Sequence, residues 1–344
     1  MKTKNELQNL DTQMESINKI INLVNKLLSN NPEWKSRYKD YIMKIEKTTT
    51  KRNRRPFHKP EGLSLYSSVS RRDGKKYDLR FDGQSVGEIE VNDKGGIWLI
   101  PNEKSNKKLF KEEYSELQMP KKVGWSSAEA SIFRLFFRKK SREANSIKLK
   151  SPEHQLENRL LKEFAKKTRA EGKVLCNIQP VRLYNCFFQF PTPLKASDHV
   201  PEYSRQYSGG IDILARVKSV DGNSRICVME LKDENKKNES QAEAMKQAIS
   251  YSVFIATLLR SESGSSWWDF IMNRGSKTKP IPKHLNIDVV TVMPEGSTEE
   301  FCEREIDLQE LSCTLYCHTL YYNSKDYING KFTFTGTYPP HIRK

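Results

Sequence analysis

The sequence has 344 residues, enough for two or three domains with hydrophobic cores of their own. Its 59 lysines and arginines outnumber 43 aspartates and glutamates, and the formal net charge of +16 favours a polyanionic partner, nucleic acid before an anionic membrane surface. No apolar run reaches the length of a membrane span, the N-terminus lacks the apolar core of a signal peptide, and the six cysteines form no CxxC pair. These features argue against transmembrane, disulfide-rich and zinc-ribbon proteins, and they predict a cytoplasmic protein without a membrane partner.

Residues 1–60 predict two helices and a basic linker. Apolar residues from Leu7 to Leu28 recur in alternating steps of three and four, and Asn31-Pro32 begins a second helix. Because the heptad helix is only marginally stable alone, it forms either an intramolecular helical hairpin, which we favour, or the seam of a homodimer. The basic run at residues 51–59 either grips phosphates or is a solvated linker.

Residues 61–120 predict a small antiparallel β module. Short alternating segments are punctuated by Asp-Gly and Gly-Gly turns, and Tyr77, Leu79 and Phe81 share one face. The spacing predicts a meander of about four strands, a size that suits recognition or packing rather than an enzyme core. Residues 102–125 are polar and lysine-rich, and they predict a boundary between modules.

Two amphipathic helices open the C-terminal part. The first is expected over residues 126–140, with Ile132 in its apolar stripe. The second starts at Ser151-Pro152 by capping chemistry and runs to about residue 164. Residues 174–190 predict a strand or a bent pair of strands, and residues 191–210 predict a long loop.

The next segment predicts a β-hairpin. Residues 211–217 and 225–232 are rich in branched apolar side chains and flank Asp221-Gly222, a dipeptide that suits a tight turn. In the register set by that turn, Asp212 lies opposite Leu231 or one of its neighbours. The aspartate is therefore expected at the end of the hairpin, next to the last residues of the second strand.

This register gathers three charged groups at one end of an apolar hairpin. Asp212 lies level with Glu230 and Lys232, and the last two share one face because side chains alternate along a strand. Burying unpaired charge is costly, so such a cluster indicates function. Two carboxylates suit Mg²⁺ or Mn²⁺, and a lysine beside the ion could orient its water or neutralise a phosphoryl group. The pattern predicts hydrolysis of phosphodiester bonds.

A helix and further strands are expected after the hairpin. Residues 238–260 predict a helix on which Gln247 and Tyr251 share a face. Residues 287–294 predict a buried strand and residues 311–322 another, whose two cysteines lie too far apart along a strand to share one zinc ion. Adjacent tryptophans after a Ser-rich turn are expected in the core, and the tail predicts an edge strand.

At the hairpin the sequence resembles the PD-(D/E)XK nuclease superfamily, in which an aspartate on one strand is followed by Glu-x-Lys on the next. Asp212 and Glu230-Leu231-Lys232 match these positions, and Ile211 stands where proline is usual. The resemblance implies a divalent metal held by both carboxylates and the carbonyl of Leu231, with Lys232 beside the attacking water. Members of the superfamily serve restriction, repair or defence against phage.

The resemblance also assigns roles to two helices. The core of the superfamily begins with a helix that often carries a glutamate facing the metal, a position that Glu157 fits best and Glu153 next best. Gln247 and Tyr251 look like the Gln-x-x-x-Tyr element of the RecB-like branch, in which this element helps to shape the active site. Gln247 would accordingly buttress the site.

Together these features predict a mixed α/β chain with a helical hairpin or coiled coil at residues 1–60, an antiparallel β module at 61–120 and a nuclease domain at 126–344. The last domain is expected to hold a restriction-endonuclease-like mixed sheet flanked by helices. The expected function is that of a Mg²⁺-dependent nuclease that acts on DNA in preference to RNA. The alternative is a catalytically inactive nucleic-acid-binding or assembly protein that retains the fold.

Overall fold

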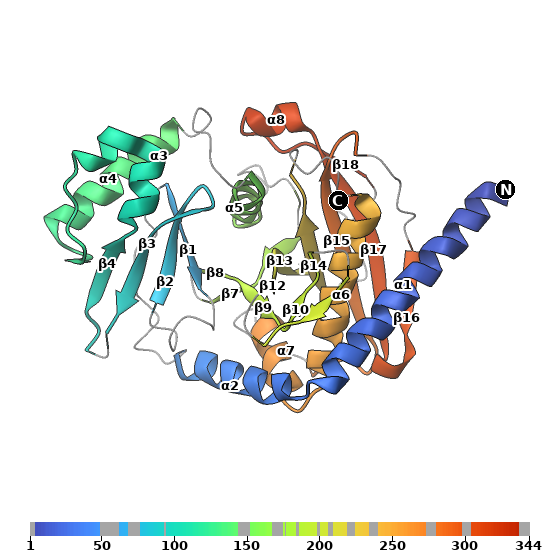
Figure 1. The fold of residues 1–344 in the computed structure, drawn as a ribbon. Coiled ribbons are helices and arrows are strands. Elements are labelled where there is room, and N and C mark those ends of the chain that lie inside the picture. The colour runs from blue at the N-terminus through green and yellow to red at the C-terminus, as the bar shows by residue number, and fades with distance from the viewer. Residues whose placement is uncertain are drawn as a thin grey trace.

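The computed structural model describes residues 4–48, 62–67, 76–92, 94–143, 152–166, 175, 177–183, 186–197, 200–205, 209–218, 224–233, 240–272, 280–297 and 304–336. Within these ranges the chain forms two seven-stranded sheets with helices packed against them (Figure 1). The chain is therefore mixed α/β, as predicted from the sequence. We call the sheet built mainly from residues 63–124 the first sheet and the other the second sheet.

The second sheet contains the predicted hairpin. Its strands follow the order β16-β17-β15-β14-β13-β6, with β18 paired to β17. Strands β6, β13 and β14 are antiparallel neighbours, whereas β14, β15 and β17 run parallel. The strands of this sheet are β6 (Ile178–Pro180), β13 (Ile213–Lys218), β14 (Ser224–Leu231), β15 (Leu285–Pro294), β16 (Arg304–Leu308), β17 (Cys313–Tyr322) and β18 (Phe334–Gly336).

Helices cover both faces of the second sheet. Helix α6 (Gln241–Leu259) connects β14 to the parallel strand β15 and packs on one face. It begins with a capping box, in which Ser240 and Glu243 each accept a hydrogen bond from the other's backbone N–H. Helix α5 (Pro152–Phe164) packs against the other face through its buried leucines. The layers are therefore helix, sheet and helix, with α5 lying between the two sheets (Figure 1).

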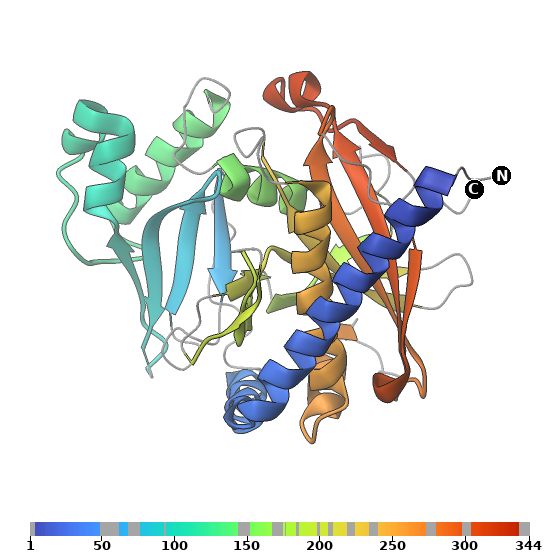
Figure 2. The same cartoon turned by 45° about the vertical axis from the view of Figure 1, so that its right-hand side comes forward.

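The two N-terminal helices exist as predicted, but they pack differently. Helix α1 (Lys4–Asn30) lies diagonally across α6 (Figure 2), and α2 (Glu33–Thr48) packs Trp34 and Tyr38 on Phe254 of α6. Both helices thus complete the core around α6, whose side chains are buried on nearly all sides and need cover away from the sheet. The buried stripe of α1 comprises Ile17, Ile20, Ile21, Val24 and Leu28.

This packing bears on the predicted homodimer seam. From Ile17 to Leu28 the heptad stripe is buried against the same chain. The side chains of Leu7 and Leu10, and the basic run at residues 51–59, lie outside the described residues. The structure thus places the helices in the C-terminal core, where the sequence predicted a self-contained hairpin.

The first sheet contains the predicted meander. Strands β1 (Leu63–Ser67), β2 (Lys76–Phe81), β3 (Gln84–Val91) and β4 (Ile97–Pro101) are antiparallel neighbours, and Tyr77, Leu79 and Phe81 are buried in its core. Strand β5 (Val123–Gly124) pairs with β4 at one edge. At the other edge two strands from much later in the chain are added, β7 (Arg182–Leu183) and β8 (Cys186–Phe188), of which β8 runs parallel to β1.

A helix occupies much of the segment predicted as a boundary. Helix α3 (Glu103–Ser115) starts at Asn102, whose side chain accepts a hydrogen bond from the backbone N–H of Ser105. Phe110 and Tyr114, on either side of a kink at Lys111, are buried against the first sheet. The sequence did not indicate this helix, because only two aromatic anchors mark it within a lysine-rich segment.

Helix α4 (Ala128–Arg142) also belongs to the first sheet. Phe133 and Phe137 are buried there, whereas Ile132, predicted in the apolar stripe, is 47% exposed. The core of the first sheet therefore unites residues 62–143 with Cys186 of β8. The sequence-predicted domain start at residue 126 falls inside this unit, because the expected boundary relied on local composition and the sheet closes by distant pairing.

The segment predicted as a long loop contains short strands. Strand β9 (Phe190–Thr192) pairs with β12 (Gly209–Ile211), and β10 (Leu194–Lys195) pairs with β11 (Glu202–Tyr203). Phe190 is fully buried in the core shared with α6 and anchors β9 there. The pair β9–β12 leads the chain directly into Asp212.

The remaining sequence predictions concern the core. The adjacent tryptophans lie on α7 (Gly264–Met272) and are buried, as expected. Cys313 and Cys317 are buried, unpaired thiols on β17, which confirms the predicted strand. A short helix that was not predicted, α8 (Ser324–Ile328), precedes the edge strand β18. In the described ranges, no helix combines the length and apolar character needed to cross a bilayer.

Candidate active site

The register of the hairpin places Asp212 beside Glu230. Strands β13 and β14 pair with Ile213 opposite Met229, so the preceding residue, Asp212, lies level with Glu230, within one position of the expected partner. Oδ2 of Asp212 accepts a hydrogen bond of 2.9 Å from the backbone N–H of Leu231. The aspartate is thus held at the end of the hairpin, although the turn dipeptide itself lies outside the described residues.

Lys232 joins Glu230 to helix α6. Its Nζ donates hydrogen bonds to Oε1 of Glu230 at 3.1 Å and to Oε1 of Gln247 at 2.9 Å. Gln247 in turn lies 3.5 Å from the hydroxyl of Tyr251, one turn further along the helix. The structure therefore brings together Asp212, Glu230, Lys232 and Gln247, in the arrangement expected from strand alternation and helix spacing.

Helix α5 contributes two more carboxyl groups. Glu157 is 4% exposed, and Glu153 is half-buried. Burial raises the pKa of Glu157 to about 8; the guanidinium of Arg80 opposes this rise, while the negative charges of Asp212 and Glu153 add to it. Both glutamates that the sequence singled out therefore lie near the charged end of the hairpin.

The electrostatics of this cluster are unfavourable without an added cation. Burial raises the pKa of Glu230 well above its usual range, and the charge of Asp212 raises it further, whereas the ammonium of Lys232 acts in the opposite direction. Glu153 adds to the rise as well. Four carboxyl groups thus interact, opposed by the ammonium of Lys232 and the guanidinium of Arg80, and a bound divalent cation would further favour their ionised forms.

The residues present fit such a cation. Oε2 of Glu230 is buried and has no hydrogen-bond partner among the described residues, and carboxylate oxygens are ligands that Mg²⁺ and Mn²⁺ prefer. Within the same ranges no three His, Cys, Asp or Glu side chains form a complete metal-binding group. A bound ion would therefore complete its shell with a backbone carbonyl, such as that of Leu231, and with water or substrate oxygens.

Buried polar contacts fix the strands that carry the site. The backbone N–H of Lys232 donates to the carbonyl of Val292 on β15, and the hydroxyl of Tyr322 on β17 donates to the carbonyl of Lys232. Thr291, the neighbour of Glu230 on β15, is hydrogen-bonded to Thr319, which also accepts from Gln241 of α6. These contacts lock the end of β14 against two parallel strands and the start of α6.

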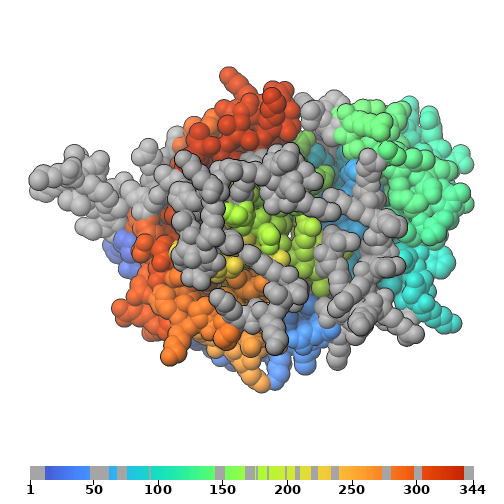
Figure 3. Space-filling view, turned by 180° about the vertical axis from the view of Figure 1, so that it is seen from behind, coloured from blue at the N-terminus to red at the C-terminus, as the bar shows by residue number. Residues whose placement is uncertain are grey.

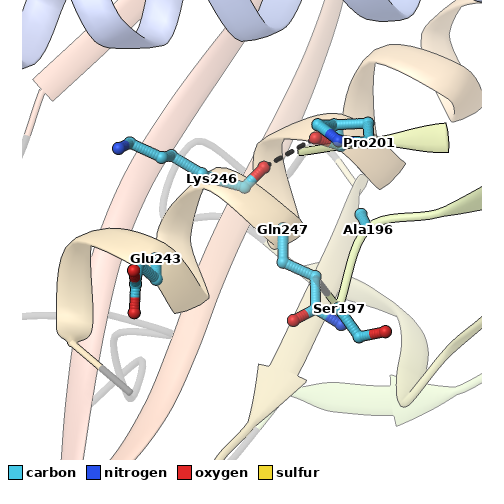
Figure 4. Close-up of a pocket in the computed structure, with 7 residues that line it drawn as sticks. Ala196, Ser197, Pro201, Glu243, Lys246 and Gln247 are labelled. Atoms are coloured by element: carbon cyan, nitrogen blue, oxygen red, sulfur yellow. Dashed lines mark hydrogen bonds between the residues drawn. The ribbon is translucent and has the colours of Figure 1, made fainter. Parts of the chain in front are cut away.

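A small pocket lies next to Gln247. It is formed by α6 and the segment that follows β10, with Gln247 extending toward Ser197 while Lys246 extends away from it (Figure 4).

Seen from behind, the yellow-green surface of the central strands lies between the green and cyan first-sheet unit and the orange C-terminal strands (Figure 3). Asp212 is only half-buried, so the cluster reaches solvent at the end of the hairpin.

Sequence reasoning missed the polar face of β2. Asp78, Arg80 and Asp82 alternate with the buried Tyr77, Leu79 and Phe81, and all three are themselves buried, beside α5. The signal was present, because a strand whose second face reads Asp-x-Arg-x-Asp has charged groups that require partners. Finding those partners required the contact between the two sheets, which local periodicity does not reveal.

Comparison with known proteins gives no relative for this chain. No protein-family model matches the sequence, and searches of curated proteins and of solved structures found no significant similarity.

Proposed function

We propose that this chain is a nuclease that hydrolyses phosphodiester bonds with Mg²⁺ or Mn²⁺ and prefers DNA to RNA. The observation that carries the proposal is the buried, unpartnered Oε2 atom of Glu230, next to Asp212 and Lys232. A carboxylate oxygen in that position is available to bind a cation. A divalent cation beside an ammonium group would in turn attract the negatively charged oxygens of a phosphodiester.

Each residue of the cluster has a role in this proposal. Asp212, Glu230 and the carbonyl of Leu231 would hold the metal, and Glu157 would assist through the metal or a water molecule. A bound divalent cation lowers the pKa of its water ligand and neutralises charge on a phosphoryl oxygen. Lys232, oriented by Gln247 at 2.9 Å, would position the attacking water.

The order of elements supports the proposal. In chain order, the elements α5, β6, β13, β14, α6 and β15 form a helix, three antiparallel strands, a second helix and a parallel strand; the short strands β7–β12 are inserted between β6 and β13, and α7 follows α6. This order is consistent with a restriction-endonuclease-like core. The excess of 59 basic over 43 acidic residues suits a protein that approaches a polyphosphate backbone.

The direct test is incubation with linear, circular and single-stranded DNA and with RNA, in Mg²⁺ and then in EDTA. We expect Mg²⁺-dependent cleavage of DNA that EDTA abolishes. Lys232→Ala should slow cleavage by roughly a hundredfold or more, because an ammonium group beside the reacting phosphate is lost. The Lys246→Ala variant removes one positive charge from the residue that precedes Gln247 in α6, where the side chain extends away from Ser197 (Figure 4), and it should cleave at the parent rate.

Two results would contradict this proposal. Undiminished cleavage by a folded Lys232→Ala variant would remove the proposed mechanism. Binding of DNA by the parent without cleavage of any substrate would instead favour a nucleic-acid-binding or assembly protein that keeps the fold. Lys232→Met, which retains most of the aliphatic stem, provides a second variant if the alanine variant does not fold.

A further inference from the structure

The polar face of β2 lies against the helix that carries Glu157. Asp82 directly follows this strand and accepts hydrogen bonds from Arg159, with Oδ2 at 2.9 Å from Nη2, and from Gln155 at 2.6 Å. The next residue, Gly83, has a φ of +91° and lies so close to α5 that an added Cβ would meet the carbonyl oxygen of His154 at 2.1 Å. The tip of β2 is therefore fixed to α5 by an ion pair and by direct backbone contact.

Arg80 sits two residues before this junction and is held on three sides. Its Nε donates to Asp78 at 2.6 Å, its Nη2 donates to Gln189 at 3.1 Å, and its guanidinium carbon lies 4.1 Å from the ring centre of Tyr66. Asp78 also accepts a hydrogen bond of 2.6 Å from Ser85, so its two oxygens are both engaged. These contacts orient the guanidinium as a rigid group.

One end of this guanidinium has no partner. Arg80 is 8% exposed, and its Nη1 is buried without a hydrogen-bond acceptor among the described residues. A guanidinium N–H in that position is costly unless an acceptor is supplied. Arginine presents a planar donor fork that matches phosphate oxygens, so a phosphate is the acceptor that its chemistry suits best.

The unpartnered end belongs to the same neighbourhood as the carboxylates. Tyr66, under the guanidinium, accepts a hydrogen bond of 2.9 Å from Asn158, the neighbour of Glu157 in α5. The charges of Arg80 and Glu157 interact, yet no hydrogen bond or ion pair joins these two described residues. Arg80 Nη1 and Glu230 Oε2 are thus two buried, unpartnered atoms of opposite charge in one region of the molecule.

We propose that Arg80 binds a phosphate of the nucleic-acid backbone beside the carboxylate cluster, so that the first sheet supplies part of the active site. This inference rests on the proposed nuclease function. A phosphodiester bound with its metal would satisfy both unpartnered atoms, because it offers acceptor oxygens to Nη1 and brings a cation to Glu230. The ion pair between Asp82 and Arg159 holds β2 against α5 and so fixes the position of Arg80 relative to Glu157.

The inference is tested by DNA binding in EDTA, where no cleavage occurs. Fluorescence anisotropy of labelled short single-stranded and duplex DNA is measured over a range of salt concentrations. Arg80→Gln should weaken binding roughly tenfold and reduce the slope of log affinity against log salt by about one. Lys76→Gln is the matched control, since it removes one charge from the same strand, where Lys76 pairs with Glu88 at 3.3 Å. It should change affinity by less than about twofold.

The outcomes separate a specific contact from a general charge effect. Parent-like affinity and salt slope in a folded Arg80→Gln variant would overturn the inference, as would an equal loss in Lys76→Gln. Circular dichroism and thermal unfolding check the fold. If the glutamine variant does not fold, Arg80→Lys decides the matter: it keeps the charge but loses the planar fork, and unchanged binding by it would also overturn the inference.

Cleavage assays in Mg²⁺ distinguish failure of this inference from failure of the nuclease proposal. If the parent binds DNA through Arg80 but cleaves no substrate, the phosphate contact stands and the proposed reaction fails. If the parent cleaves but Arg80→Gln binds and cleaves as the parent does, only the role of Arg80 fails.

Discussion

Without a metal, the side chains at the end of the hairpin destabilise one another. Asp212 raises the pKa of both Glu157 and Glu230, which means that its charge disfavours the ionised form of each neighbour. The ammonium of Lys232 acts in the opposite direction on Glu230, and the guanidinium of Arg80 does so on Glu157. If the cluster binds a cation as proposed, its mutual repulsion in the metal-free protein is expected to lower stability in exchange for function.

Asp212→Asn should have opposite effects on stability and on cleavage. The amide keeps an oxygen that can accept from the backbone N–H of Leu231, but it removes one negative charge from the cluster. We expect the free energy of unfolding in EDTA to rise by about 1 kcal/mol, because the repulsion with two buried carboxyl groups is relieved. Cleavage in Mg²⁺ should fall at least roughly a hundredfold.

Thermal unfolding with and without Mg²⁺ provides the second readout. Mg²⁺ should raise the unfolding temperature of the parent, since an ion that binds only the folded state stabilises it, and should raise that of Asp212→Asn much less. Asp269→Asn, the same change at an exposed position on α7, is the control and should behave as the parent. Equal stabilisation of parent and Asp212→Asn by Mg²⁺ would show that Asp212 does not hold the ion.

Much of the site follows from the sequence because its signals are local. Alternation along β14 and the turn dipeptide were enough to place Asp212, Glu230 and Lys232 together, and helix spacing added Gln247. Arg80 could not be found in this way. Its environment depends on Gln189 and on α5, which are distant in sequence and are brought to β2 only by the packing of the two sheets.

At the scale of elements, the turn between β2 and β3 is the contact that aligns the first sheet with α5. Asp82 and Gly83 both have positive φ, of 43° and 91°, a combination typical of a tight two-residue hairpin turn. Asp82 carries the ion pair with Arg159, and Gly83 allows the close approach to the backbone of His154. The position of Glu157 therefore depends on a turn that carries no catalytic group.

Gly83→Ala should disturb this alignment. The new Cβ would overlap the carbonyl of His154, so either the turn or α5 must move, and we expect unfolding to become easier by at least about 2 kcal/mol. Cleavage should fall as well, because α5 carries Glu157. Chemical denaturation and initial rates measure the two effects.

The chain contains a matched control for this variant. Gly95 has a φ of +81°, but no atom of the described residues lies within 4 Å of the position that an added Cβ would take, so Gly95→Ala carries the backbone strain without the clash. It should cost about 1 kcal/mol and leave cleavage unchanged. Equal effects of the two substitutions would mean that the contact between the turn and α5 does not position the site.

Elements were predicted well where periodicity was strong and poorly where pairing was distant. The meander, α5, α6 and β15 follow from alternation or helical stripes, whereas α3 has only Phe110 and Tyr114 to mark it within a lysine-rich segment. The pairing between distant segments could not be predicted for another reason. The pairing of Tyr66 with Phe187 joins strands that lie on either side of three helices, and composition does not encode such a partner.

At the scale of the whole molecule, the N-terminal helices pack with the second sheet and α6 in one core. Trp34 is fully buried, its ring lies 5.7 Å from that of Phe254 on α6, and its Nε1 donates to the carbonyl of Leu28. The hydroxyl of Tyr38 donates to the carbonyl of Pro191, in the strand pair that leads to Asp212. The helices therefore support the site from the far side of α6.

Removal of residues 1–48 should accordingly leave a chain that does not fold. The truncation uncovers the apolar face of α6 that α1 and α2 bury. Gel filtration and circular dichroism should detect aggregation or loss of structure, and cleavage should disappear. A truncated chain that is monomeric, folded and active would instead establish the helices as a separate module.

A single substitution tests the same packing more gently. Trp34→Ala should lower the free energy of unfolding by about 3–5 kcal/mol, as expected for removing a large buried aromatic side chain. Leu135→Ala, at a position 59% exposed on α4, should change it by less than about 0.5 kcal/mol. Urea unfolding of both variants gives the comparison.

The addition of β8 to the free edge of β1 has a consequence for biosynthesis. A ribosome releases β1 long before β8, because α3, α4 and α5 are made in between. Until Phe187 arrives, the nascent chain exposes an unpaired strand edge of the kind that recruits other strands. During translation this edge is either protected by a chaperone or captured by a neighbouring nascent chain on the same messenger RNA. The balance between these two outcomes would then determine how much protein reaches the native state.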